Sequence, residues 1–86
     1  MTLDELRIAL RTVLVAEDTQ EVDWALVEAF CLETIGRLNR EGEPEYPHDV
    51  VYRFLDDADI RRQDADYAKI QRERLMAWLD TPNSQA

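Results

Sequence analysis

The stretch DWALVEAFCLETIGRLNR, residues 23–40, decides the class of fold, because its apolar residues recur at helical spacing. One stripe of this expected helix faces a core and consists of Trp24, Val27, Cys31, Thr34, Ile35 and Leu38. A second stripe, on a different side, consists of Ala25, Ala29, Leu32 and Gly36. A helix that is apolar on two sides is usually covered on both. We therefore expect this segment to form the central helix of an all-helical core.

Typical helix-capping residues flank this segment and the segment that precedes it in the chain. Asp23 or Thr19 is the expected N-cap, since a side-chain oxygen there accepts a bond from a free backbone N–H. Gly42 is the expected stop. Thr2 and Glu5 have the spacing of a capping box and open an earlier helix. The apolar stripe of that earlier helix consists of Leu3, Leu6, Leu10, Val13 and Leu14.

Two further helices are expected after the connector EGEPEYP, residues 41–47. Pro47 suits the first turn of a helix, because its missing N–H has no partner there in any case. The inner face of this short third helix holds Val50, Val51, Phe54, Leu55 and Ala58. Asp64 or Asp59 is the expected start of the last helix, whose apolar face holds Tyr67, Ile70, Leu75, Trp78 and Leu79.

No stretch alternates with period two strongly enough to indicate a strand. We therefore predict an all-α, single-domain four-helix bundle with a short third helix. The helices are expected over residues 2–16, 20–40, 47–57 and 60–79. The domain spans 1–80, and 81–86 form a flexible C-terminal tail.

The charge balance favours a basic partner. The 86 residues include 10 Lys or Arg and 19 Asp or Glu, which gives a net charge of −9. Such a charge repels nucleic acid and anionic membranes, and no apolar run is long enough to span a bilayer. Cys31 is the only cysteine, so no internal disulfide forms and a cytoplasmic location is expected.

The acidic stretch FLDDADIRRQDADY, residues 54–67, has three interpretations: a metal loop, a surface for a basic partner, or the polar start of a helix. A calcium loop that starts at Asp57 places Arg61 at position 5 and Arg62 at position 6, where an oxygen ligand and a glycine are required. A metal site is therefore disfavoured, and neither a metal nor a cofactor is predicted.

Helix capping and a solvated helix face explain much of this charge. Aspartates favour the positive end of a helix macrodipole. Asp57 and Arg61 have the favourable i,i+4 order, as do Asp49 and Arg53.

The outer face of the third helix is the candidate partner-binding site. His48, Tyr52, Asp56 and Asp59 fall on the side opposite the apolar face, and Tyr46 extends this patch from the connector. An exposed aromatic side chain ringed by carboxylates is common in protein-binding surfaces, since the ring provides contact area and the acids pair with Lys or Arg.

Few residues offer catalytic chemistry. His48 is the only histidine, and Cys31 lies on an inward stripe, where a small buried hydrophobe is expected rather than a thiolate. Ser84 is the only serine and lies in the tail, which excludes a serine triad. A carboxylate pair for acid–base chemistry stays open. No catalytic residue is predicted.

Ile8 and Val15 lie opposite the main stripe of the first helix. They are either scattered surface apolar residues, which are normal, or a self-association seam.

In size, charge and helix pattern the predicted domain resembles the colicin-type nuclease immunity proteins. That resemblance, which includes no aligned motif, implies a protein that blocks a basic toxin by electrostatic and aromatic contacts. The leading hypothesis is a small, acidic, non-catalytic binding domain that engages a basic protein partner through the third helix, as an inhibitor or adaptor. The alternatives are a bacterial-style helical accessory or regulatory subunit acting as a homodimer, and a small acid–base or metal-dependent enzyme.

Overall fold

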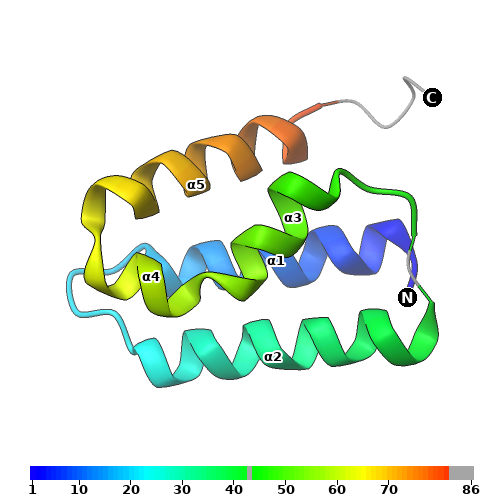
Figure 1. Cartoon of the computed structure of the whole chain (residues 1–86), viewed down its shortest axis with the longest axis horizontal. Helices are drawn as coiled ribbons and strands as arrows, with labels where there is room; N and C mark the ends of the chain where they lie inside the picture. Colours follow the sequence, from blue (N-terminus) through cyan, green and yellow to red (C-terminus); the bar gives the residue numbers. More distant parts are fainter. Residues whose placement is uncertain (43, 82–86) are drawn as a thin grey trace.

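The computed structural model describes residues 1–42 and 44–81 and confirms an all-α domain (Figure 1). Of the predicted tail over 81–86, residues 82–86 lie outside the described residues. Thr81 donates from its N–H to the Trp78 carbonyl at 3.0 Å and from its hydroxyl to the Ala77 carbonyl at 2.8 Å. The described chain forms five helices: α1 (Leu3–Glu17), α2 (Trp24–Glu41), α3 (His48–Asp56), α4 (Ala58–Gln63) and α5 (Ala65–Leu79).

The helices enclose one apolar core. α2 packs against α1, α3 and α4, while α5 packs against α3 and α4. In Figure 1, α3 and α4 run between α2 and α5, with α1 behind them. The largest buried apolar side chains belong to the predicted inward stripes and are Leu6, Leu10, Val13, Val27, Leu38, Val51, Phe54, Leu55, Leu75 and Leu79. The prediction of Ile70 on the inner face is wrong, since it is 48% exposed and α5 instead buries Ala68 and Gln71. None of the helices described is long and apolar enough to cross a membrane.

The predicted caps are present. The Thr2 hydroxyl accepts from the Glu5 N–H at 3.1 Å, and the Glu5 carboxylate accepts from the Thr2 N–H at 2.8 Å. Asp23 caps α2 by accepting from the Leu26 N–H at 3.2 Å. Gly42 ends α2 with a φ of 85°, a left-handed conformation that favours glycine.

The predicted last helix over 60–79 is two helices, α4 and α5, that meet at Asp64. This residue is extended, with φ −131° and ψ 101°, and closes α4 while it caps α5. Its side chain accepts from the Tyr67 N–H at 3.0 Å. An aspartate that bonds a backbone N–H three residues on favours a new helix start over continuation of the old helix.

The prediction that α2 is covered on both sides is wrong. Its first stripe faces the core, but Ala25 and Ala29 of its second stripe are exposed, and Leu32 is 68% exposed. α2 still contacts three helices, because all three pack around its first stripe and the flanks of that stripe. Gly36, the fourth residue of the stripe, is half-buried, so its exposed part consists of Ala25, Ala29 and Leu32.

A buried ion-pair network joins α1, α4 and α5. Arg61 is 1% exposed, and its guanidinium donates to both oxygens of Glu17, the shortest contact being 2.8 Å from Nη2. Arg72 donates to the other side of the same carboxylate at 2.9 Å. Arg61 also donates to the Phe54 carbonyl and, at 3.0 Å, to Gln71 Oε1. The network fixes the position of α4 and of the joint that precedes it.

The C-terminal end of α5 is bonded to α1. Arg7 and Arg11 donate to the Leu79 carbonyl at 2.8 Å and 3.2 Å. The Arg7 guanidinium also lies 4.6 Å from the centre of the Trp78 ring. Cations at a helix C-terminus compensate its unpaired carbonyls and the negative end of its dipole. Arg7 and Arg11 therefore stabilise the packing of α5 against α1.

Candidate partner-binding site

The outer side of α3 carries a stack of three aromatic rings. The His48 ring lies 5.4 Å from that of Tyr46 and 4.8 Å from that of Tyr52, and both pairs are nearly parallel, at 16° and 11°. Tyr46 reaches the stack from the connector, and the other two residues lie one turn apart on α3. His48 is exposed, while both tyrosines are half-buried. Three of the five residues of the predicted patch thus form one stack.

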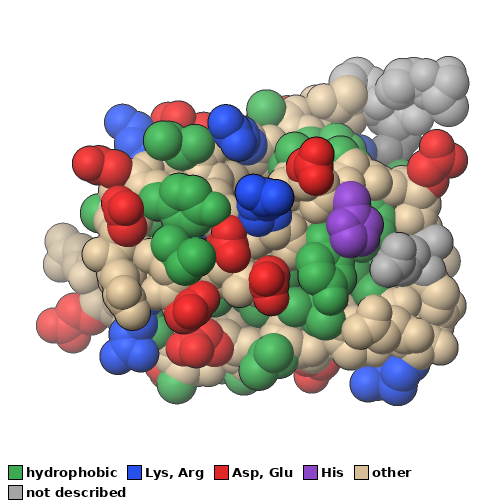
Figure 2. Space-filling view, viewed as in Figure 1, with side chains coloured by type: hydrophobic (Ala, Val, Ile, Leu, Met, Phe, Trp, Pro, Cys, Tyr) green, Lys and Arg blue, Asp and Glu red, His purple; other side chains and the backbone are tan. Residues whose placement is uncertain are grey.

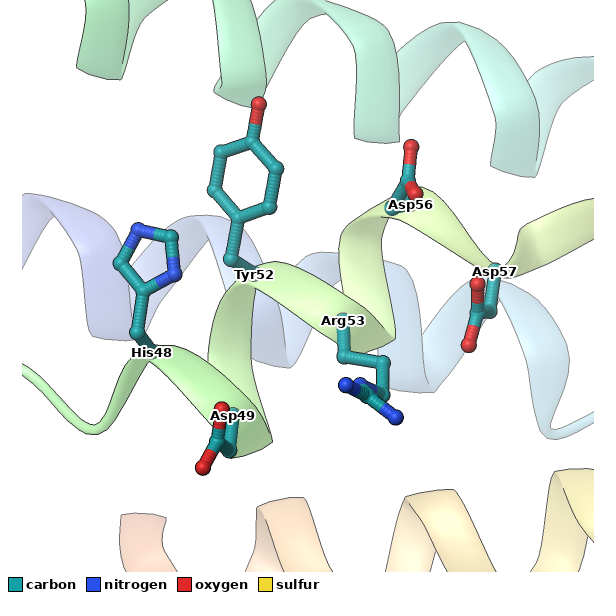
Figure 3. Close-up of a pocket in the computed structure, with 6 residues that line it drawn as sticks. All are labelled: His48, Asp49, Tyr52, Arg53, Asp56 and Asp57. Carbon is teal, nitrogen blue, oxygen red and sulfur yellow. The ribbon is translucent and has the colours of Figure 1, made fainter.

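A hollow of about 310 Å³ lies beside this stack and is lined by His48, Asp49, Tyr52, Arg53, Asp56 and Asp57. In Figure 3, Tyr52 and Asp56 extend from α3 toward α2, whereas Asp49 and Arg53 extend toward α5. The sequence did not indicate Asp49 as a site residue, because its spacing to Arg53 fitted a helix-surface ion pair. That pair is not formed among the ion pairs of the described chain.

Asp59 lies apart from the stack, on α4 beyond the joint at Asp57. It lines a second hollow, of about 290 Å³, with Leu32 of α2 and Asp56 of α3. Asp56 thus lines both hollows and connects them. The helical spacing that groups Asp59 with His48 and Tyr52 continues two residues past the predicted helix end at 57, and the structure places Asp59 on α4. We call Tyr46, His48, Tyr52, Asp56 and Asp59 the α3 face.

Asp57 is structural, and the predicted pair with Arg61 is wrong. Its carboxylate accepts from the Tyr67 hydroxyl at 2.7 Å and from Gln71 Nε2 at 3.1 Å. The bond to this carboxylate raises the pKa of the Tyr67 phenol. Asp57 therefore joins the α3–α4 joint to α5, while Arg61 binds Glu17.

The one thiol is buried. Cys31 is 1% exposed, and burial raises the pKa of its thiol from 9.0 to about 11. A thiol with such a pKa is protonated at neutral pH and is a poor nucleophile. No group of three His, Cys, Asp or Glu side chains within residues 1–42 and 44–81 is arranged to hold a metal ion.

Because the pKa of Cys31 is raised, we expect the free energy of unfolding to depend on pH in the alkaline range. The unfolded thiol ionises near pH 9 and the folded thiol near pH 11, so the stabilisation is complete below pH 9 and is lost as the pH rises toward 11. Across that window, the free energy of unfolding of the wild type should fall by about 1.4 kcal/mol per pH unit more than that of Cys31→Ala. Urea unfolding of both proteins tests this, and parallel pH profiles would contradict it. The contribution of Tyr67 cancels in the comparison.

Ile8 and Val15 are both exposed, at 66% and 71%. They line different grooves: Ile8 faces the groove between α1 and α2, and Val15 faces the one between α1 and α5. They do not share a groove, and the self-association seam stays a prediction.

No protein-family model, no curated protein and no solved structure matches this chain. The resemblance to the immunity proteins thus has no support from related sequences or folds. A function for the chain has to be inferred from its surface.

Proposed function

We propose that this protein is a non-catalytic binding protein that engages a basic protein partner through the α3 face, as an inhibitor or adaptor. The observation that carries the proposal is the stack of Tyr46, His48 and Tyr52 beside the exposed carboxylate of Asp56, which connects the stack to the second hollow and its Asp59. In Figure 2, carboxylates gather over α3 and α4 with hydrophobic side chains between them.

The carboxylates of this surface are available to a partner. Asp49, Asp56 and Asp59 form no ion pair within the part of the chain that the structure describes. Their charge is part of the net charge of −9, which attracts a basic protein over a distance of about a Debye length, ~8 Å at physiological salt. Lys or Arg side chains of the partner would complete the pairs that the fold leaves open.

The aromatic stack supports a role as an anchor. Each ring restrains the next, so less conformational entropy is lost when a partner covers them. Tyrosine is enriched at the energetically important positions of interfaces because it combines a large apolar area with a hydroxyl that can bond across the contact. The stack thus supplies contact area, and the surrounding acids supply charge complementarity.

The proposal predicts association that depends strongly on salt. The partner is obtained by capture on the immobilised protein from the native lysate at low salt, followed by elution with a salt step. Its association rate should fall at least about tenfold between low and physiological salt, because electrostatic steering is screened. Stopped-flow or surface-based kinetics measure this rate. An association rate that does not change with salt would rule out a charge-guided interface.

A further inference from the structure

The exposed second stripe of α2 borders the hollow that Asp59 lines. Leu32, the more exposed of the two large apolar residues on the surface of α2, lines this hollow and is 68% exposed. The apolar side chains that line this hollow with Leu32 are Cys31, Ile35, Leu55 and Ala58. The acidic side chains that line it are Glu28 of α2, Asp56 of α3 and Asp59 of α4. We call this surface the α2–α3 groove.

The groove has an unbalanced charge. Among the described residues, no Lys or Arg lines it, and its three carboxylates form neither an ion pair nor a hydrogen bond with another residue. Apolar side chains lie between acids that come from three different helices. The chemical complement of such a surface is an apolar side chain with cations on both sides.

The shape of the α2 stripe favours a helix as the complementary element. Ala25, Ala29 and Leu32 follow one another at i, i+4 and i+7, which places them along about two turns, or ~10 Å, of one helix face. The two alanines allow the backbone of a second helix to approach closely, and Leu32 is the ridge against which it packs.

We infer that the α2–α3 groove binds a cationic amphipathic helix of the basic partner. An apolar side chain of that helix packs against Leu32, and its flanking Lys or Arg side chains pair with Glu28, Asp56 and Asp59. This inference rests on the proposed function, because Asp56 and Asp59 belong to the α3 face as well. It adds to that proposal the kind of segment that the partner presents.

The test uses a fluorescein-labelled synthetic peptide with Leu along one helical face and Lys on both flanks of that face. Its binding to the full chain is measured by fluorescence anisotropy at low salt. Leu32→Ser should weaken binding at least about tenfold, because it removes the apolar anchor. The matched control is Ile8→Ser, since Ile8 is 66% exposed on α1, outside the groove, and this change should alter binding less than about twofold.

A second pair of variants tests the charges. Glu28→Gln removes a carboxylate of the groove, whereas Glu33→Gln removes one from the same helix that instead lines the groove between α1 and α2. Both lower the net negative charge equally. We expect Glu28→Gln to weaken peptide binding several-fold more than Glu33→Gln. Equal effects of the two would show that the peptide is held by net charge alone and would overturn the inference.

The outcomes distinguish the inference about the α2–α3 groove from the proposal about the α3 face. If the peptide does not bind, or if Leu32→Ser and Ile8→Ser bind it equally, the inference that the groove binds a cationic helix is wrong. If the groove fails in this way but Tyr52→Ala still weakens binding of the captured partner, the proposed function stands without the groove. Peptide binding that depends on Leu32, combined with partner binding that is unaffected by Tyr52→Ala, supports the groove and removes the aromatic stack from the binding site. Circular dichroism of each variant shows whether it is folded.

Discussion

Replacing Arg61 by methionine is expected to lower the free energy of unfolding by about 3–5 kcal/mol. The guanidinium of Arg61 is fully buried and pairs with the buried carboxylate of Glu17 at 2.8 Å. Removal of the cation leaves that carboxylate with Arg72 alone and leaves the Phe54 carbonyl and Gln71 Oε1 without this donor. Buried polar groups that lose a partner retain the full cost of their desolvation.

The total free energy of unfolding of a protein domain is about 5–15 kcal/mol, so the destabilisation expected for Arg61→Met is a large share of it. Urea unfolding followed by circular dichroism measures it. Arg62→Met is the matched control, because Arg62 is the next residue of α4 and is exposed, so its change should stay within about 0.5 kcal/mol. Glu17→Gln should also destabilise the protein, since it leaves both arginines without their carboxylate. If Arg61→Met is as stable as Arg62→Met, the network does not hold α4 in place.

The helices were predictable because their signals are local. Thr2 with Glu5, Asp23 and Gly42 mark helix ends through bonds or backbone angles within a few residues, and the structure has each of them. Apolar spacing identified the inward stripes for the same reason.

The interior ion pair was not predictable from local spacing. Glu17 and Arg61 are 44 positions apart, and each resembles an ordinary residue of a charged helix surface. Pairing with Asp57 four residues earlier was the simplest local expectation, but packing of α4 against α2 and α5 buries Arg61 beside the distant carboxylate of Glu17 instead. Local pattern does not show which charges the packing of helices will enclose.

The candidate site was predicted in part. The i, i+4 spacing of His48 and Tyr52 placed them on one side of α3, and their rings stack there with Tyr46. Asp59 was grouped with His48 and Tyr52 by continuing the spacing past the predicted helix end at 57, and the start of α4 places it at a second hollow instead. Leu32 was expected to be covered by another helix of this chain. Its spacing could not show this, because an apolar stripe has the same spacing whether the helix that covers it belongs to the same chain or to another protein.

Replacing Tyr52 by alanine is expected to weaken binding of the basic partner by at least about 2 kcal/mol, or ~30-fold. The substitution removes the ring on which His48 stacks at 4.8 Å, and with it the apolar wall of the hollow between Asp49 and Asp56. The half-buried ring of Tyr52 provides contact area at a small cost in conformational entropy. Alanine provides neither the contact area nor the stacking.

Two further variants define what Tyr52 contributes. Tyr52→Phe keeps the ring and its stacking, so it should retain most of the affinity if ring contact rather than the hydroxyl dominates. Met76→Ala is the control for loss of an exposed apolar side chain, because Met76 is on α5 and lines the groove toward α1. Circular dichroism and urea unfolding should show that all three variants are folded.

The decisive measurement is the dissociation constant of the captured partner for wild-type, Tyr52→Ala and Met76→Ala proteins, determined by titration calorimetry at low salt. We predict a loss of about 30-fold for Tyr52→Ala and less than about twofold for Met76→Ala. Equal affinities for wild type and Tyr52→Ala, or an equal loss in both variants, would show that the partner does not bind at the α3 face.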